Sequence, residues 1–214
     1  MQNESPSPYD LVVRAVLGLC LVMACKSPPG PRDAAPPALP GEERGSFALT
    51  YYWVATEGAG NGDTKIFDAK CGVLATVSSD FANDLSTAGT GRLRDGRTLT
   101  TDGECSCPRS PCFRVIDKRW GIGAGNRSLV PFRSVAVDRN VIPIGTKLWI
   151  KELAGLDVDQ LFPHDGCVVA DDVGGNITGA KIDWFVGDRA LYTDIDHALK
   201  LTSITVHDGG ELCP

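Results

Sequence analysis

Three aspartates in the C-terminal half of the chain are of the residue type that acid–base chemistry needs. Each lies in or directly after a stretch typical of a β-strand: Asp138 after Ser-Val-Ala-Val, Asp172 after Cys-Val-Val-Ala-Asp, and Asp183 inside Ile-Asp-Trp-Phe-Val. A carboxyl group that keeps its proton near neutral pH acts as a general acid, and a nearby carboxylate raises its pKa. The three aspartates are therefore candidate catalytic residues, although on residue type alone a rim of solvated aspartates is the commoner arrangement.

Glycines surround two of these aspartates. Gly174, Gly175 and Gly179 lie between Asp172 and Asp183. Glycine permits tight turns and a close approach of the backbone to a ligand. We therefore expect the three glycines to bind a polymeric substrate beside the aspartates.

The elements that must position these residues are mostly short strands. Apolar and β-branched stretches predict strands, and a 3.6-residue apolar period predicts one late helix over 188–201. A further helical turn or two is expected near Phe81–Ser86, and 89–96 is expected to be a loop ahead of another short strand. Many strands with one late helix favour a small closed barrel, in a mainly β fold with loop insertions. The predicted strands are 47–55, 112–117, 134–138, 147–151, 166–171, 182–186 and 203–207.

Composition limits the function. The chain has 214 residues, with 21 Lys and Arg against 27 Asp and Glu, and a formal charge of −6. Nucleic-acid binding needs clustered positive charge, so this function is disfavoured. Charged residues at 22% disfavour both a disordered chain and a polytopic membrane protein. The sequence predicts no metal and no cofactor.

The N-terminus resembles that of an exported lipoprotein. The apolar stretch 12–24 is interrupted by Arg14 and is short for a membrane span, so 1–24 is expected to be a signal peptide. It ends in Val-Met-Ala before Cys25, as in the lipobox of bacterial lipoproteins, which makes Cys25 the expected lipidation site. An ordinary signal peptide with an incidental cysteine is the alternative. Lys26 after the cysteine favours the outer membrane, facing the periplasm.

The stretch that follows is rich in proline and poor in large aliphatic residues. Such a composition cannot bury a core, so 25–45 is expected to be an extended tether that carries the lipid. The globular domain is then expected over 46–214.

Six cysteines remain in the globular part. Export and an even number predict three disulfides, whose pairing the sequence leaves open. Cys105 and Cys107 are too close in the chain to pair easily. A zinc site in this cysteine-rich segment is disfavoured, because no partner C-x2-C is present. The disulfide candidates are Cys71, Cys105, Cys107, Cys112, Cys167 and Cys213.

The segment 130–208 resembles the 3D (Asp-Asp-Asp) domain. This domain occurs in bacterial cell-wall enzymes and in the C-terminal part of the membrane-bound lytic murein transglycosylase A family. Asn176 and Thr178 depart from the family's usual residues. The matching residues are Val135-Ala-Val-Asp138, Ile142-Pro-Ile-Gly-Thr146 and the run Ala170-Asp-Asp-Val-Gly-Gly-Asn-Ile-Thr-Gly-Ala-Lys-Ile-Asp183.

The resemblance implies a six-stranded double-psi β-barrel and cleavage of peptidoglycan glycan strands. Asp183 corresponds to the acid that protonates the glycosidic oxygen between N-acetylmuramic acid (MurNAc) and N-acetylglucosamine (GlcNAc). The MurNAc C6 hydroxyl then closes a 1,6-anhydro ring. We expect Asp138 and Asp172 to raise the pKa of Asp183 by charge repulsion. The implied partners are peptidoglycan and, through the lipid, a membrane, and the chain is expected to be a monomer.

Two alternatives to a lytic transglycosylase remain. One is a hydrolytic muramidase that uses a second carboxylate. The other is a non-catalytic glycan-binding barrel like that of the expansins, although the presence of all three aspartates favours an enzyme.

Four weaker signals have ordinary structural explanations. A glycine-rich run at 121–126 lacks the last glycine of a dinucleotide loop, so nucleotide binding is disfavoured. His164 is an auxiliary acid or, more simply, a rim residue. Trp184 should face away from Asp183, because side chains alternate along a strand. The remaining tryptophans are Trp53, Trp120 and Trp149. They could stack on sugar rings, but packing in the core is the simpler explanation for each.

Overall fold

A computed structural model describes residues 38–158 and 163–214, which fall in one compact unit, 38–214. The predicted signal peptide, Cys25 and most of the predicted tether lie outside the described residues. In the described part, no helix is both long and apolar enough to cross a bilayer.

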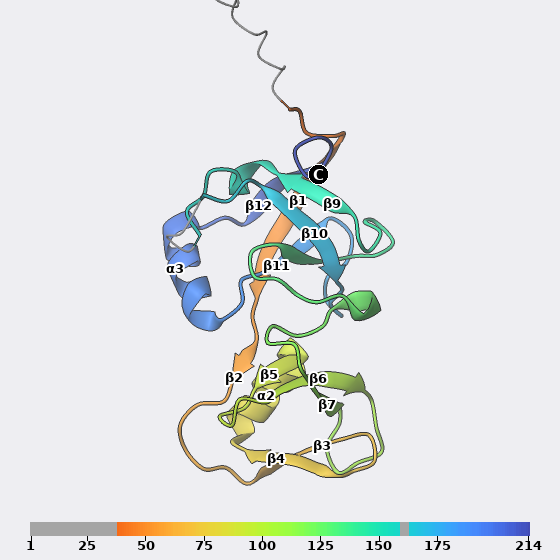
Figure 1. Cartoon of the computed structure of the whole chain (residues 1–214), viewed down its shortest axis with the longest axis vertical. Coiled ribbons are helices and arrows are strands. Elements are labelled where there is room, and N and C mark those ends of the chain that lie inside the picture. Colours follow the sequence, from red (N-terminus) through yellow and green to blue (C-terminus); the bar gives the residue numbers. More distant parts are fainter. Residues whose placement is uncertain (1–37, 159–162) are drawn as a thin grey trace, which may run out of the picture. The chain divides into compact units, whose positions relative to one another are not determined.

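Six strands form a closed barrel, as the sequence predicts (Figure 1). Their order around the barrel is β1, β11, β8, β10, β9, β12. Two neighbouring pairs, β1 with β11 and β8 with β10, are parallel, and the others are antiparallel. The strands are β1 (Glu43–Tyr52), β8 (Ser134–Val137), β9 (Lys147–Ile150), β10 (Cys167–Asp172), β11 (Lys181–Phe185) and β12 (Ser203–Asp208).

Alternation along the strands fills the barrel with apolar side chains. In β11, Ile182 and Trp184 are buried in the barrel core, and Asp183 between them faces the other side. The expected orientation of Trp184 is thereby confirmed. The indole N–H of Trp184 donates to the carbonyl of Phe132, so the polar atom of this buried side chain has a hydrogen-bond partner.

The first strand begins earlier than predicted. The amide of Gly41 donates to the carbonyl of Asp208, and the Arg44 guanidinium pairs with the Asp208 carboxylate. These contacts bring residues 41–45, which the composition assigned to the tether, into the β1–β12 pairing.

A second group of elements lies between β1 and β8 in the sequence and has its own core. It contains a sheet with strand order β2-β5-β6-β7, a β3–β4 hairpin and the helix α2. We call this group, residues 55–116, the insert lobe. The sequence analysis did not separate it from the barrel, because its strands are short and weakly patterned. Its elements are β2 (Ala55–Thr56), β3 (Thr64–Phe67), β4 (Val73–Val77), α2 (Ser79–Ala88), β5 (Thr90–Arg92), β6 (Thr98–Gly103) and β7 (Cys112–Ile116).

Helix α2 is longer than the predicted turn or two, because both of its ends are capped. The Ser78 hydroxyl accepts a hydrogen bond from the amide of Phe81. At the other end Gly89 has φ = 70° and donates its amide to the carbonyl of Leu85. The first part of the predicted loop 89–96 is instead the strand β5, which pairs with β2 and β6, and 93–96 forms a turn before β6.

The late helix is confirmed as α3 (Arg189–Leu199), with Ile195 buried in the barrel core. The helical turn or two predicted near Phe81–Ser86 is the helix α2, so the described residues contain a second helix besides α3. Two short 3-10 helices complete the fold, η1 (Ala124–Asn126) and η2 (Lys151–Leu153).

All six cysteines of the globular part form disulfides, so the expected three bonds are confirmed. Cys71–Cys107 and Cys105–Cys112 lie in the insert lobe, and Cys167–Cys213 joins β10 to the end of the described chain. The sulfurs of Cys105, Cys107 and Cys112 lie within 4.8 Å of one another, a spacing that suits a metal. A disulfide leaves no thiolate to bind one, so the geometry supports bonded cysteines rather than a zinc site.

Candidate active site

A cleft of about 250 Å³ runs between the open face of the barrel strands and the insert lobe. The barrel side supplies Asp172, Asp183 and the loop 173–175, and the lobe side supplies residues 87–90 and 100–101. Aromatic side chains form much of the remaining wall: Tyr52, Trp53, Trp120 and Phe185.

Strand register brings Asp172 and Asp183 to this cleft. Ala136 on β8 pairs with Asp172 of β10 on one side and with Asp183 of β11 on the other. Two strand spacings of about 4.8 Å therefore separate the Cα atoms of the aspartates by about 10 Å. The side chain between them is a methyl group, which leaves the space between the two carboxyl groups open.

A β-bulge in β10 sets the direction of Asp172. Ala170 pairs with Val135 and Asp172 with Ala136, so Asp171 is an extra residue on this strand. The buried Asp171 carboxylate accepts a hydrogen bond from the Ser134 hydroxyl at 2.7 Å and pairs with Arg127. Of these two adjacent aspartates, Asp171 thus stabilises the strand, and Asp172 faces the cleft.

Asp183 has one fixed hydrogen bond and one free oxygen. The Thr50 hydroxyl donates to its Oδ1 at 2.6 Å, and no donor among the described residues reaches its Oδ2. Burial raises the pKa of Asp183, while the Thr50 hydrogen bond and the charge of Lys181 oppose that rise. The predicted cause, repulsion from Asp138 and Asp172, is wrong, because desolvation is what raises this pKa.

Both oxygens of Asp172 are engaged. The Val173 amide donates to Oδ1 at 2.8 Å, the Tyr52 hydroxyl donates to Oδ2 at 3.2 Å, and the Ala124 amide is a third donor. Burial nevertheless raises the pKa of Asp172 to about 6, with a smaller contribution from the charge of Asp171. The cleft therefore keeps a proton in mildly acidic solution.

Tyr52 is coupled to both carboxyl groups. Burial raises the pKa of its hydroxyl well above the usual value, and the charges of Asp172 and Asp183 raise it further. Tyr52 therefore stays neutral and acts as a hydrogen-bond donor to Asp172. The sequence analysis missed it, although its place at the end of a strand beside Trp53 was visible.

The glycine-rich run 121–126 has a structural purpose at this site. Gly123 packs against β10 so closely that a Cβ atom on it would lie 2.4 Å from the Asp171 carbonyl oxygen and 3.1 Å from the Asp172 Cβ. The next residue, Ala124, donates its amide to Asp172. The run that superficially suggested a nucleotide therefore positions a catalytic candidate.

Replacing Gly123 with Ala should push this loop away from β10. We expect the Ala124 hydrogen bond to weaken, which raises the pKa of Asp172 further, and the free energy of unfolding to fall by about 1–3 kcal/mol. Urea denaturation and the pH profile of activity measure both effects. Gly58→Ala is the matched control, since a Cβ there meets nothing within 4 Å. Wild-type stability and pH profile for Gly123→Ala would contradict this packing role.

Asp138 lies apart from the cleft lining. Its Oδ1 accepts the amide of Asn140 at 2.9 Å and its Oδ2 the amide of Gly179 at 2.8 Å. These hydrogen bonds lower the pKa of Asp138, so it is a carboxylate that anchors the glycine loop. Gly174 and Gly175 line the cleft as expected, whereas Gly179 is on the Asp138 side of the loop, with φ = +64°.

The structure also separates the weaker candidates. His164 is buried, with one ring nitrogen against the Phe132 carbonyl and the other accepting the Gly166 amide. Burial lowers its pKa, so it is a neutral residue of the barrel interior. Trp53 and Trp120 line the cleft, but Trp149 instead donates its indole N–H to the Asp165 carbonyl.

Comparisons with known proteins agree with this architecture. Residues 133–195 match the family model of the 3D domain. The fold is similar to that of E. coli MltA in a crystal structure with bound chitohexaose, with 17% identity, a TM-score of 0.57, and coverage of 77% of this chain and 71% of that chain. It is also similar to a membrane-bound lytic murein transglycosylase from Agrobacterium tumefaciens, with 15% identity, a TM-score of 0.51, and coverage of 78% and 74%.

No curated protein sequence matches the chain significantly. At such low identities the two structural similarities establish the fold. Together with the matched residues, they show that this chain carries a 3D domain, built on a barrel fold like that of MltA.

Proposed function

We propose that this chain cleaves the glycan strands of peptidoglycan as a lytic transglycosylase. The observation that carries the proposal is the pair of half-buried carboxyl groups, Asp172 and Asp183, which face one cleft from either side of Ala136. Only one of the two, Asp183, has an oxygen free to meet a substrate. That difference divides their roles.

Asp183 is the acid and then the base. Its free carboxyl oxygen protonates the glycosidic oxygen as the bond from C1 of MurNAc breaks and the GlcNAc hydroxyl leaves. The C6 hydroxyl of the same MurNAc then bonds to C1 and gives its proton to the Asp183 carboxylate. The acid is restored, the product has a 1,6-anhydro ring, and no water is consumed.

Asp172 supplies the negative charge of the reactive form. Its three donors, from Val173, Tyr52 and Ala124, hold it in place but only partly offset the burial that raises its pKa to about 6. The Asp172–Asp183 pair therefore shares one proton, which lies on Asp183 in the reactive form. A carboxylate held next to C1 stabilises the positive charge that develops on the sugar when the glycosidic bond breaks. Asp138 acts indirectly, because it positions the glycine loop at the cleft wall.

The cleft wall suits a sugar polymer. Trp53 and Trp120 offer aromatic rings on which sugar rings can stack, and Gly174 and Gly175 allow the backbone to come close to the strand. Gly175 in particular has open space where a Cβ atom would be. A structural neighbour, E. coli MltA, is seen with bound chitohexaose, which is a linear sugar polymer.

Mass spectrometry of material released from purified sacculi tests the proposal. Fragments that end in 1,6-anhydro-MurNAc are the expected result. Fragments with a reducing MurNAc end would replace the transglycosylase with a hydrolytic muramidase. Binding without release would leave an expansin-like glycan-binding barrel.

We also propose that Cys25 is lipidated after export and anchors the domain to a membrane. The supporting observation is the apolar stretch that ends in Val-Met-Ala-Cys, followed by the proline-rich segment. Replacing Cys25 with Ser should move the protein from the membrane to the soluble periplasmic fraction of the producing cell. Activity on added sacculi should be unchanged, because the proline-rich segment after Cys25 has too few large apolar residues to support the barrel. Unchanged membrane partitioning of Cys25→Ser would remove the anchor.

A further inference from the structure

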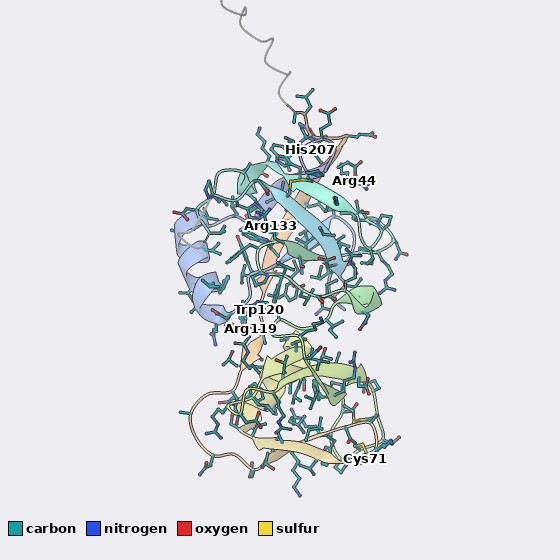
Figure 2. The ribbon with its side chains drawn as sticks, viewed as in Figure 1. Arg44, Cys71, Arg119, Trp120, Arg133 and His207 are labelled. Atoms are coloured by element: carbon teal, nitrogen blue, oxygen red, sulfur yellow. A yellow bond between two sulfur atoms is a disulfide. The ribbon has the colours of Figure 1, made fainter. Side chains whose placement is uncertain are left out.

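Two arginines approach the same tryptophan ring at the edge of the active site. The guanidinium carbon of Arg92 lies 5.1 Å, and that of Arg119 lies 4.8 Å, from the ring centroid of Trp120. Arg92 also donates from a terminal nitrogen to the carbonyl of Arg119 at 3.2 Å. Figure 2 shows Arg119 and Trp120 next to each other. Contact with the ring restricts both guanidinium groups, so less conformational entropy is lost when they bind an anion.

Neither of these arginines has a carboxylate partner within the part of the chain that the structure describes. Three further arginines, all in the insert lobe, are ion-paired: Arg94 pairs with Glu57, Arg97 with Asp95 and Arg114 with Asp102. A chain with a formal charge of −6 has ample carboxylates to neutralise exposed arginines. Two adjacent guanidinium groups left without one constitute a ready anion site.

A hollow lies beside this pair. It has a volume of about 360 Å³ and is lined by Arg92, Arg119 and Asp117, together with Gly96, Thr98 and Ile116. The hollow thus presents two positive charges and one negative charge. A ligand with carboxylates and an amino group would match both signs.

Trp120 joins this hollow to the catalytic cleft. Its ring lines the cleft that contains Asp172 and Asp183, and it packs edge-on against Phe185, with the ring centroids 6.3 Å apart. Phe185 is two residues beyond Asp183 on the same strand. An anion held by Arg92 and Arg119 is therefore separated from the glycan cleft by a single aromatic side chain.

We propose that Arg92 and Arg119 bind a carboxylate of the stem peptide that peptidoglycan carries on MurNAc. The inference rests on the proposed function and specifies its substrate as a peptide-bearing strand. The stem peptide leaves the glycan from the lactyl group of the very sugar whose C1 bond is broken. It carries free carboxylates and, on its diamino acid, an amino group that suits Asp117. The arginine pair therefore selects glycan strands that still have their peptides.

Binding to immobilised glycan strands tests this selection independently of catalysis. The protein carries Asp183→Asn, so that the strands are not consumed. Three probes are compared: strands with stem peptides, the same strands stripped of peptides by an amidase, and peptide-bearing strands whose carboxylates are converted to carboxamides. We expect the first probe to bind most tightly. Replacing Arg92 and Arg119 with Gln should weaken its binding by about fivefold for each arginine, and should leave binding of the other two probes unchanged.

Arg114→Gln is the matched control. It removes the same charge from the insert lobe, but from an arginine already paired with Asp102, and it should leave the preference intact. Thermal unfolding checks that each variant is folded, and Arg119→Lys, which keeps the charge but loses the planar fork, should fall between wild type and Arg119→Gln.

The possible outcomes separate this inference from the proposed function. Equal binding of all three probes, or an equal loss on all three in the Arg92→Gln/Arg119→Gln variant, would overturn the peptide site. If the wild-type protein, without Asp183→Asn, still releases anhydro-muropeptides in that case, the proposed transglycosylase activity stands. Arginine-dependent selection without any release of muropeptides would uphold the peptide site and overturn the enzyme. Displacement of the peptide-bearing strands by inorganic phosphate at equal concentration would show a general anion site and overturn carboxylate selection.

Discussion

Asp183→Asn should reduce the release of anhydro-muropeptides by two to four orders of magnitude, which is about the range for loss of a general acid–base group. Asparagine keeps the size of the side chain and can still accept the hydrogen bond from Thr50, so the protein should fold normally. It has no titratable proton to give to the glycosidic oxygen. Initial rates on purified glycan strands, with circular dichroism to check folding, measure the effect.

Asp138→Asn is the matched comparison for this variant. It removes a carboxylate from the same barrel, but one that holds the amides of Asn140 and Gly179 outside the cleft lining. We expect a loss of less than about tenfold, which is of the size expected for a weakened loop contact. Near-wild-type turnover by folded Asp183→Asn, or a larger loss in Asp138→Asn, would transfer the catalytic role to another carboxyl group.

Asp172→Asn should shift the pH profile of activity to lower pH and reduce turnover by about two orders of magnitude. The active form of the cleft holds one proton on the Asp172–Asp183 pair. As the pH rises through about 6, the pKa of Asp172, the wild-type pair loses this last proton and activity should fall. In the variant only Asp183 titrates. Its pKa is raised by burial, but without a second carboxyl group to share the proton the alkaline limb should move to lower pH.

Protein stability provides an independent measurement of the same pKa. The folded-state pKa of Asp172 is above its unfolded value, so its contribution to stability is complete below about pH 4 and is lost as the pH rises through about 6. The shift of about two pKa units corresponds to at most about 3 kcal/mol. Urea unfolding at several pH values should show this loss in wild type and a smaller one in Asp172→Asn. An identical pH dependence in both proteins would place the raised pKa elsewhere.

The sequence predicted the barrel better than it predicted the rest. Strands such as β11 can be predicted because polar and apolar side chains alternate along them. Asp172 and Asp183 lie in one continuous motif, so their spacing can also be read from the sequence. The insert lobe has strands of two to six residues, and two disulfides stabilise it. Strands this short show little alternation of polar and apolar residues in the sequence, so the sheet of the insert lobe was not predicted.

The site was predicted in part for a similar reason. The register with Ala136 brings Asp172 and Asp183 together, whereas Asp138 turns toward Gly179, and no local pattern distinguishes these two outcomes. Tyr52 and Gly123 reach the site from distant parts of the chain. Desolvation also depends on the complete fold, which is why the sequence assigned the raised pKa of Asp183 to charge repulsion.

The barrel closes between strands that are far apart in the chain, and this affects the order of folding. The first strand pairs with β11 and β12, as in the contacts Thr50–Asp183 and Ser46–Ser203, which span 133 and 157 residues. The insert lobe, by contrast, forms mostly from neighbours in sequence. Contacts of high sequence separation form slowly, since a long loop must be closed before they stabilise anything. The lobe and its two disulfides are therefore expected to form early, and the hydrogen bond that orients the catalytic carboxyl group arises only when the last strands join the first.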